Sequence, residues 1–231
     1  MKRDVMNDNQ PTSQDTIPLS IMRHLLKLKL LALALLLCSC STTSVEKTWK
    51  SPNHQGGPVQ KVAVMAVSDA WMVRPALESR FARDLRQRGQ AVIATGDLRG
   101  LPDVKADQAG ATARLRQEGA DSILIVRLVD RATYDRQVQT TPAAFVPVAT
   151  GFDSYSWYGY YDVAFADMGS TYTSTRDHLV LDSSLFDLNT GKRIWSVATQ
   201  TVVTGDADRL VLADELVGKV TAQLVKDGMI R

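Results

Sequence analysis

The chain has 231 residues, of which 45% are apolar and 23% charged, so it can form one globular domain with a sizeable core. Lys and Arg total 27 against 25 Asp and Glu, and without the first 39 residues the balance is 22 against 22. This neutral balance lacks the basic surface that nucleic-acid binding needs, and we expect no nucleic-acid partner. Because the two cysteines are Cys38 and Cys40, residues 41–231 hold no thiol for a disulfide, a metal site or a nucleophile.

The N-terminal segment, residues 1–39, is predicted to be a signal peptide. Its apolar run, Leu30–Leu37, is far shorter than the roughly 20 residues that a helix needs to cross a bilayer. Three basic residues at positions 23–29 precede the run and small polar residues follow it, which is the order of a secretory leader. Residues 1–21 are polar and partly acidic, unlike the start of a leader, so we expect Met22 to be the true initiator.

The end of the leader predicts a lipid anchor. The sequence LCSC at 37–40 resembles the bacterial lipobox, whose cysteine is lipidated and becomes the first residue of the mature protein. Signal peptidases need small residues before the cut, which favours Cys40 over Cys38, because two leucines precede Cys38. The resemblance implies three acyl chains, such as palmitate, on Cys40, and each buried methylene adds about 0.8 kcal/mol of membrane affinity. Ser41 in place of Asp implies the periplasmic leaflet of the outer membrane. The alternative is an ordinary secretory leader with two incidental cysteines.

The first half of the mature chain is predicted to be a tether followed by alternating strands and helices. Residues 40–60 are rich in Ser, Thr, Pro and Gly and lack apolar periodicity, which predicts a flexible tether. Residues 61–231 are expected to form the periplasmic α/β domain. The run KVAVMAVS is typical of a central strand, and a helix with apolar residues at intervals of four follows it. A second strand, a second helix and the strand DSILIVRLVD complete the order βαβαβ.

The second half is predicted to hold a hairpin and a last helix. Two extended runs flank Asn189–Gly191, a hairpin signal. Asp206 and Asp208 then precede a periodic apolar run that Gly228 ends, so we interpret them as helix-capping residues and predict no metal site. The predicted fold is a single α/β sandwich of two or three layers with a mixed sheet, in the order βαβαβ, an insertion at 137–175, then ββα.

The insertion is the chain's most unusual segment, since it has no Lys or Arg and includes GFDSYSWYGYY. Three interpretations stay open: an aromatic loop over its own sheet, an exposed patch for a protein or glycan partner, and a hairpin donated to a membrane barrel. Barrel strands need about 9–11 residues of alternating polarity, and one such run is visible. In the second interpretation the partner-binding residues are Phe152, Tyr155, Trp157, Tyr158, Tyr160 and Tyr161.

Motifs for catalysis are weak, so we expect no enzyme and no cofactor apart from the covalent lipid. The turn after the first strand lacks the glycines of a nucleotide site. Ser68, Asp69 and His178 are the residue types of a hydrolase triad, but no serine lies in a G-x-S-x-G elbow.

Several segments together resemble a widespread family of largely uncharacterised proteobacterial outer-membrane lipoproteins: TWKSP, KVAVMAV, QEGADSILIVRLVD and LFDLNTGKRIWSVATQT. More distantly, the element order resembles the α/β domain of the curli secretion lipoprotein, its relatives in exopolysaccharide export, and the TolB amino-terminal domain. The resemblance implies a lipid-anchored protein that binds or scaffolds envelope components. An oligomeric export component, and hence a homo-oligomer, is the alternative, and an envelope hydrolase is a third. The resemblance supplies no catalytic residue.

Overall fold

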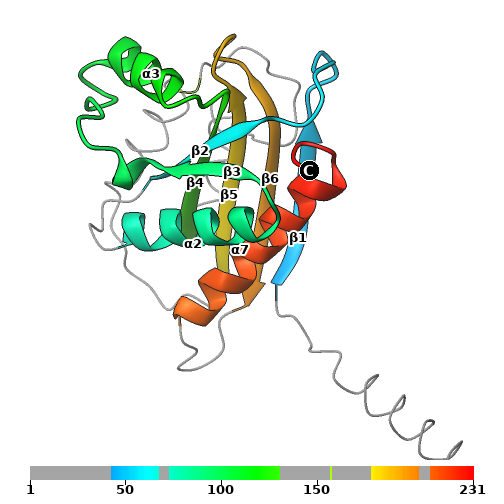
Figure 1. Ribbon diagram of the computed structural model, residues 1–231. Helices are drawn as coiled ribbons and strands as arrows, with labels where there is room; N and C mark the ends of the chain where they lie inside the picture. Colours follow the sequence, from blue (N-terminus) through cyan, green and yellow to red (C-terminus); the bar gives the residue numbers. More distant parts are fainter. Residues whose placement is uncertain (1–42, 68–72, 131–156, 158–177, 203–208) are drawn as a thin grey trace, which may run out of the picture. The chain divides into compact units, whose positions relative to one another are not determined.

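The computed structural model describes residues 43–67, 73–130, 157, 178–202 and 209–231. Within them the chain forms one mixed sheet of six strands in the order β1-β6-β5-β4-β2-β3, together with three α-helices (Figure 1). The prediction of an α/β fold with a mixed sheet is therefore confirmed.

The parallel part of the sheet is formed by the predicted βαβαβ unit. Here β2 pairs in parallel with both β3 and β4. The elements are β2 (Lys61–Val67), α2 (Val73–Gln87), β3 (Ala91–Ala94), the short 3-10 helix η1 (Thr95–Asp97), α3 (Gln108–Gln117) and β4 (Ser122–Asp130). Six residues of β2 in succession, from Val62 to Val67, are buried, because both faces of this strand are covered.

The antiparallel part contains the predicted hairpin. β5 (His178–Asp187) pairs antiparallel with β4 and with β6 (Arg193–Val202). Gly191 takes a positive φ of 70° in the turn between β5 and β6, a conformation that glycine adopts without a Cβ penalty. The last helix, α7 (Arg209–Lys226), follows β6. Asp206 and Asp208, the predicted caps, lie outside the described residues.

The structure corrects the prediction of a flexible tether at 40–60. Residues Thr43–Lys50 form β1, which pairs antiparallel with β6 at the edge of the sheet. Farther on, Ser51 N–H donates to Ile194 O at 2.9 Å and Val59 N–H donates to Met229 O at 2.9 Å. The apolar pattern could not reveal β1, because most of its side chains are exposed and the strand is held by backbone hydrogen bonds to β6.

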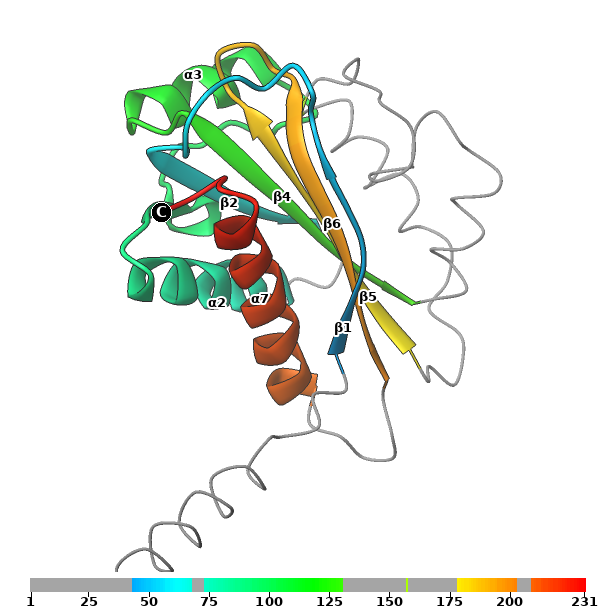
Figure 2. The same cartoon turned by 90° about the vertical axis from the view of Figure 1, so that its right-hand side faces the viewer.

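The core lies on both faces of the sheet. α2 and α7 cover one face (Figures 1 and 2). On this face Phe81, Leu85 and Leu216 belong to one buried apolar cluster with strand residues such as Val64 and Trp195. The opposite face carries a second apolar cluster formed by α3, the segment before it and single residues of the strands and the insertion: Ala63, Met65, Val67, Val104, Ala111, Leu115, Ala120, Ile123, Ile125, Trp157, Phe186 and Leu188. The arrangement is three-layered where α3 lies.

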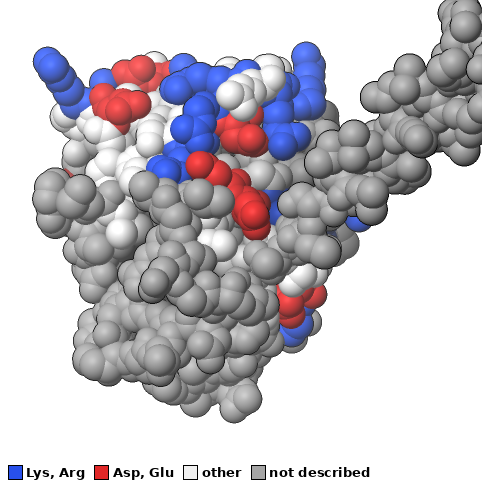
Figure 3. Space-filling view, turned by 90° about the horizontal axis from the view of Figure 1, so that it is seen from below, with Lys and Arg blue, Asp and Glu red and all other residues white. Residues whose placement is uncertain are grey.

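Charged side chains link the two helices of the first layer at their surface. Asp214 of α7 forms an ion pair with Arg80 at 3.0 Å and accepts a hydrogen bond from Arg83 at 2.7 Å. Basic and acidic groups are interspersed on the part of the surface drawn in colour in Figure 3. The Arg83–Asp214 pair is exposed on both sides, at 58% and 48%, and such pairs contribute about 0–1 kcal/mol.

Candidate functional site

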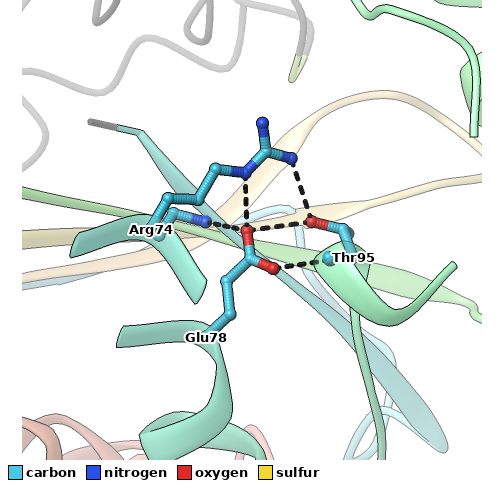
Figure 4. Close-up of polar contacts among 5 residues, drawn as sticks. Arg74, Glu78 and Thr95 are labelled. Carbon is cyan, nitrogen blue, oxygen red and sulfur yellow. Dashed lines mark hydrogen bonds and ion pairs between the residues drawn. The ribbon is translucent and has the colours of Figure 1, made fainter. Parts of the chain in front are cut away.

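A buried carboxylate lies where α/β sheets usually bind ligands, at the carboxyl ends of the parallel strands β2 and β3. Glu78 extends from α2 and is 1% exposed, although it is charged. Its Oε1 atom accepts hydrogen bonds from the Ala66 amide, Arg74 Nε and Thr95 Oγ1, each at 3.0 Å, and its Oε2 atom accepts from the Gly96 amide at 2.6 Å (Figure 4).

These bonds leave Glu78 little capacity for chemistry. Three donors converge on Oε1 and one reaches Oε2, so both oxygens are already bound within the fold. The donors come from the end of β2, from α2 and from the turn after β3, so the side chain fixes these three elements to one another. The arrangement suits a structural clamp more than a general base or a metal ligand.

A second buried charge pair lies on the sheet face opposite α2 and α7. Arg127 of β4 and Asp182 of β5 are directly opposite each other in the ladder, and both are 0% exposed. The Arg127 Nη2 atom lies 3.3 Å from Asp182 Oδ2. Such a pair is costly to bury, and its attraction offsets that cost only while both partners are present.

Neither charged cluster was predicted from the sequence. The signal for Arg127 was a single basic residue inside the apolar run ILIVRLV, where alternation places it on a face of a central strand. Glu78 stands between Leu77 and Phe81 on the buried side of α2, which was a weaker signal.

Trp157 is the one residue of the aromatic insertion that the structure describes, and it is 1% exposed. Its backbone N–H donates to Gly191 O at 3.1 Å, and its indole Nε1 donates to Thr112 Oγ1 at 3.2 Å. Its side chain packs in the cluster under α3. This corrects the prediction that Trp157 binds a partner. Its ring is buried in the core of the protein itself, where its apolar area is removed from water. The other five, Phe152, Tyr155, Tyr158, Tyr160 and Tyr161, lie outside the described residues.

Replacing Trp157 with Phe should destabilise the fold by about 1–2 kcal/mol, since it removes the indole hydrogen bond and part of the buried volume. Thermal unfolding followed by near-UV circular dichroism measures the effect. Thr112→Val is the matched variant, because it removes the acceptor and keeps the tryptophan. Two variants as stable as the wild type would contradict this account of Trp157.

Most of the other residues considered from the sequence lie outside the described part of the chain. These are Cys40, Ser68 and Asp69, whereas His178 begins β5. In the described ranges, no group of three or more His, Cys, Asp or Glu side chains could hold a metal ion. None of the helices in that part of the chain is both long and apolar enough to cross a membrane.

The start of the domain is fixed at Thr43, which is 4% exposed. Its hydroxyl donates to Glu215 Oε2 of α7 at 3.1 Å and lies 2.9 Å from the Thr201 hydroxyl of β6. The compact unit that contains the sheet begins at Ser41, directly after the cysteine of the predicted lipobox.

Comparisons with known proteins gave structural similarity alone. No family model matches the chain, and no curated protein matches it in sequence. Two structures of PelC dodecamers from Paraburkholderia phytofirmans, one of them a variant, are similar at TM-scores of 0.45 and 0.44. They are 14% and 17% identical to the chain and cover 78% and 82% of it, with 96% and 99% of their own chains aligned. Lipoprotein GNA1162 from Neisseria meningitidis has a TM-score of 0.38 and 14% identity, and the match covers 72% of this chain and 96% of that one.

Proposed function

We propose that the protein is a non-catalytic lipoprotein, anchored by lipid on Cys40 in the periplasmic leaflet of the outer membrane, where its α/β domain binds or scaffolds envelope components. The observation that carries the proposal is the agreement of two boundaries. The lipobox predicts that the mature chain starts at Cys40, and the compact unit starts at Ser41. A cut at this cysteine would therefore remove the leader and leave the fold whole.

A non-catalytic role is supported by the chemistry of Glu78. This carboxylate occupies the place where an α/β active site usually lies, and both of its oxygens accept hydrogen bonds from within the fold, from Ala66, Arg74, Thr95 and Gly96. Hydrolysis of esters or glycans by the purified protein, lost when His178 becomes Ala, would contradict this part of the proposal.

Replacing Cys40 with Ser should abolish incorporation of radiolabelled palmitate and leave unprocessed precursor, because serine has no thiol to carry the lipid. The matched control is Cys38→Ser, which should incorporate label like the wild type. Gel electrophoresis of labelled cells, combined with separation of inner and outer membranes, measures both results. Label that entered the Cys40→Ser variant, or failed to enter the wild type, would contradict the proposed anchor.

The oligomeric state separates a scaffold from an export component. The mass of the protein extracted in mild detergent should correspond to a monomer or a small oligomer. A closed ring of many subunits would contradict the scaffold and support the export alternative.

A protein or glycan partner is proposed for the aromatic insertion, through the five residues outside the described ranges. Photo-crosslinking in intact cells from Tyr155 and Tyr160 should give a defined adduct that is absent when the probe replaces Lys219. Identical adduct patterns from all three positions would contradict a specific contact.

A further inference from the structure

Very little chain separates the proposed lipid from the folded domain. Ser41 and Thr42 are the only residues between Cys40 and Thr43. Three residue steps span at most about 11 Å, at 3.3–3.6 Å for each residue of extended chain. A tether up to residue 60, as the sequence suggested, would reach roughly 70 Å by the same measure.

The first residue of β1 is held by two other elements at once, β6 and α7. Thr43 pairs with Thr201 in the ladder with β6, and its hydroxyl donates to Glu215 of α7 at 3.1 Å. Pairing with β6 continues along the strand to Lys50, which lies opposite Trp195. The anchored end of the chain is therefore part of the rigid sheet, so a lipid on Cys40 would hold the domain itself close to the bilayer.

One end of the sheet, here called the proximal end, contains Thr43 together with the ends of three other strands. Thr43 lies opposite Thr201, Val202 lies opposite His178, and Leu179 lies opposite Asp130. The opposite end, the distal end, contains the hairpin turn at Gly191. Figure 2 shows β1 starting at the end where β6 finishes, with that turn at the other end. β5 has 10 residues, and a strand of that length spans about 33 Å.

We infer that the anchor holds the domain on the bilayer with the proximal end against the lipid headgroups and the distal end in the periplasm; this rests on the proposed lipidation of Cys40. The partner of the proximal end is a phospholipid surface. Exposed charged side chains along β1, Glu46, Lys47 and Lys50, oppose the alternative in which the edge of the sheet lies flat on the bilayer, because they would lose hydration there.

The orientation has a consequence for recognition. The Trp157 amide donates to the Gly191 carbonyl at the distal end, so this residue of the insertion lies in the part of the domain farthest from the lipid. A partner that the insertion binds near Trp157 would therefore be a periplasmic protein or glycan, about 30 Å from the headgroups.

Fluorescence quenching by nitroxide-labelled lipid headgroups tests the orientation. The mature lipidated protein is purified in mild detergent and reconstituted into phosphatidylethanolamine and phosphatidylglycerol vesicles. Ser44→Cys at the proximal end and Asn189→Cys at the distal end each carry a fluorophore, since the leader with Cys38 is gone and the Cys40 thiol is acylated. Quenching should be several-fold stronger at position 44 than at position 189. Equal quenching at the two positions would overturn the inference.

A linker variant is the matched control. Inserting a Gly/Ser linker of about 30 residues between Thr42 and Thr43, with an end-to-end distance of roughly 30 Å, should remove most of the difference between the two positions. A difference that persisted unchanged would show that the short anchor does not set the orientation. Palmitate labelling of the same samples distinguishes the two proposals: labelled protein with equal quenching overturns the orientation alone, and unlabelled protein overturns the anchor on which it rests.

Discussion

Replacing Arg127 with Met should destabilise the fold by about 3–5 kcal/mol, because it leaves the carboxylate of Asp182 buried without its charged partner. Both side chains are 0% exposed and lie on adjacent central strands. Since domains of this kind are stable by only about 5–15 kcal/mol, the variant should lose a large share of its free energy of unfolding. Urea unfolding of the mature protein, followed by tryptophan fluorescence, measures the change.

A double-mutant cycle shows whether the loss comes from the pair. Asp182→Asn should cost a similar amount, and the double variant Arg127→Met with Asp182→Asn should cost clearly less than the sum of the two single changes. Arg83→Met is the exposed control, as Arg83 also pairs with a carboxylate, at 2.7 Å, but its side chain is 58% exposed. We expect it to change the free energy by less than about 1 kcal/mol. Additive effects at 127 and 182 would contradict an energetic coupling between them.

Replacing Glu78 with Gln should destabilise the fold by about 1.5–3 kcal/mol. The amide substitutes a donating NH2 group for one accepting oxygen, so either the Gly96 amide or the donors at Oε1 would face another donor. The effect should be concentrated at the junction of α2, β2 and η1. Hydrogen exchange of the Ala66 and Gly96 amides, together with urea unfolding, measures it.

The chain offers a control of the same kind for Glu78. Glu118 also pairs with an arginine four residues before it, at 2.5 Å, but its side chain is 35% exposed and the pair faces water. Glu118→Gln should change the free energy of unfolding by less than about 0.5 kcal/mol. If the two substitutions had equal effects, the proposed clamp at Glu78 would be wrong.

The two substitutions also bear on the proposed function. Glu78 and Arg127 are expected to act through stability, so a variant at either position that stays folded should retain membrane anchoring. Cys40→Ser should show the opposite behaviour, losing the anchor while the domain from Thr43 onward keeps its fold. A folded Glu78→Gln protein that lost a specific envelope contact would instead mark the ends of β2 and β3 as a binding site.

Much of the fold could be predicted from residue spacing. The buried run of β2, the apolar residues of α2 at intervals of four, and the turn at Gly191 each have a local cause that is visible in the sequence. The order of elements from β2 to α7 follows from these patterns. β1 could not be found in the same way, because a strand with exposed side chains has no apolar period and is specified by the backbone of β6.

The functional and structural sites also differ in whether the sequence alone could predict them. The lipobox at Cys40 is a prediction from the chain by itself, since a leader and its cysteine are recognised as a linear motif before folding. Only the tertiary structure decided that Trp157 is buried, that Arg127 meets Asp182, and that Thr43 is fixed three residues after the proposed anchor. The physical reason is that the partners of these residues are more than 30 positions away in the sequence. Such contacts depend on strand register and sheet order, and local patterns do not specify either of them.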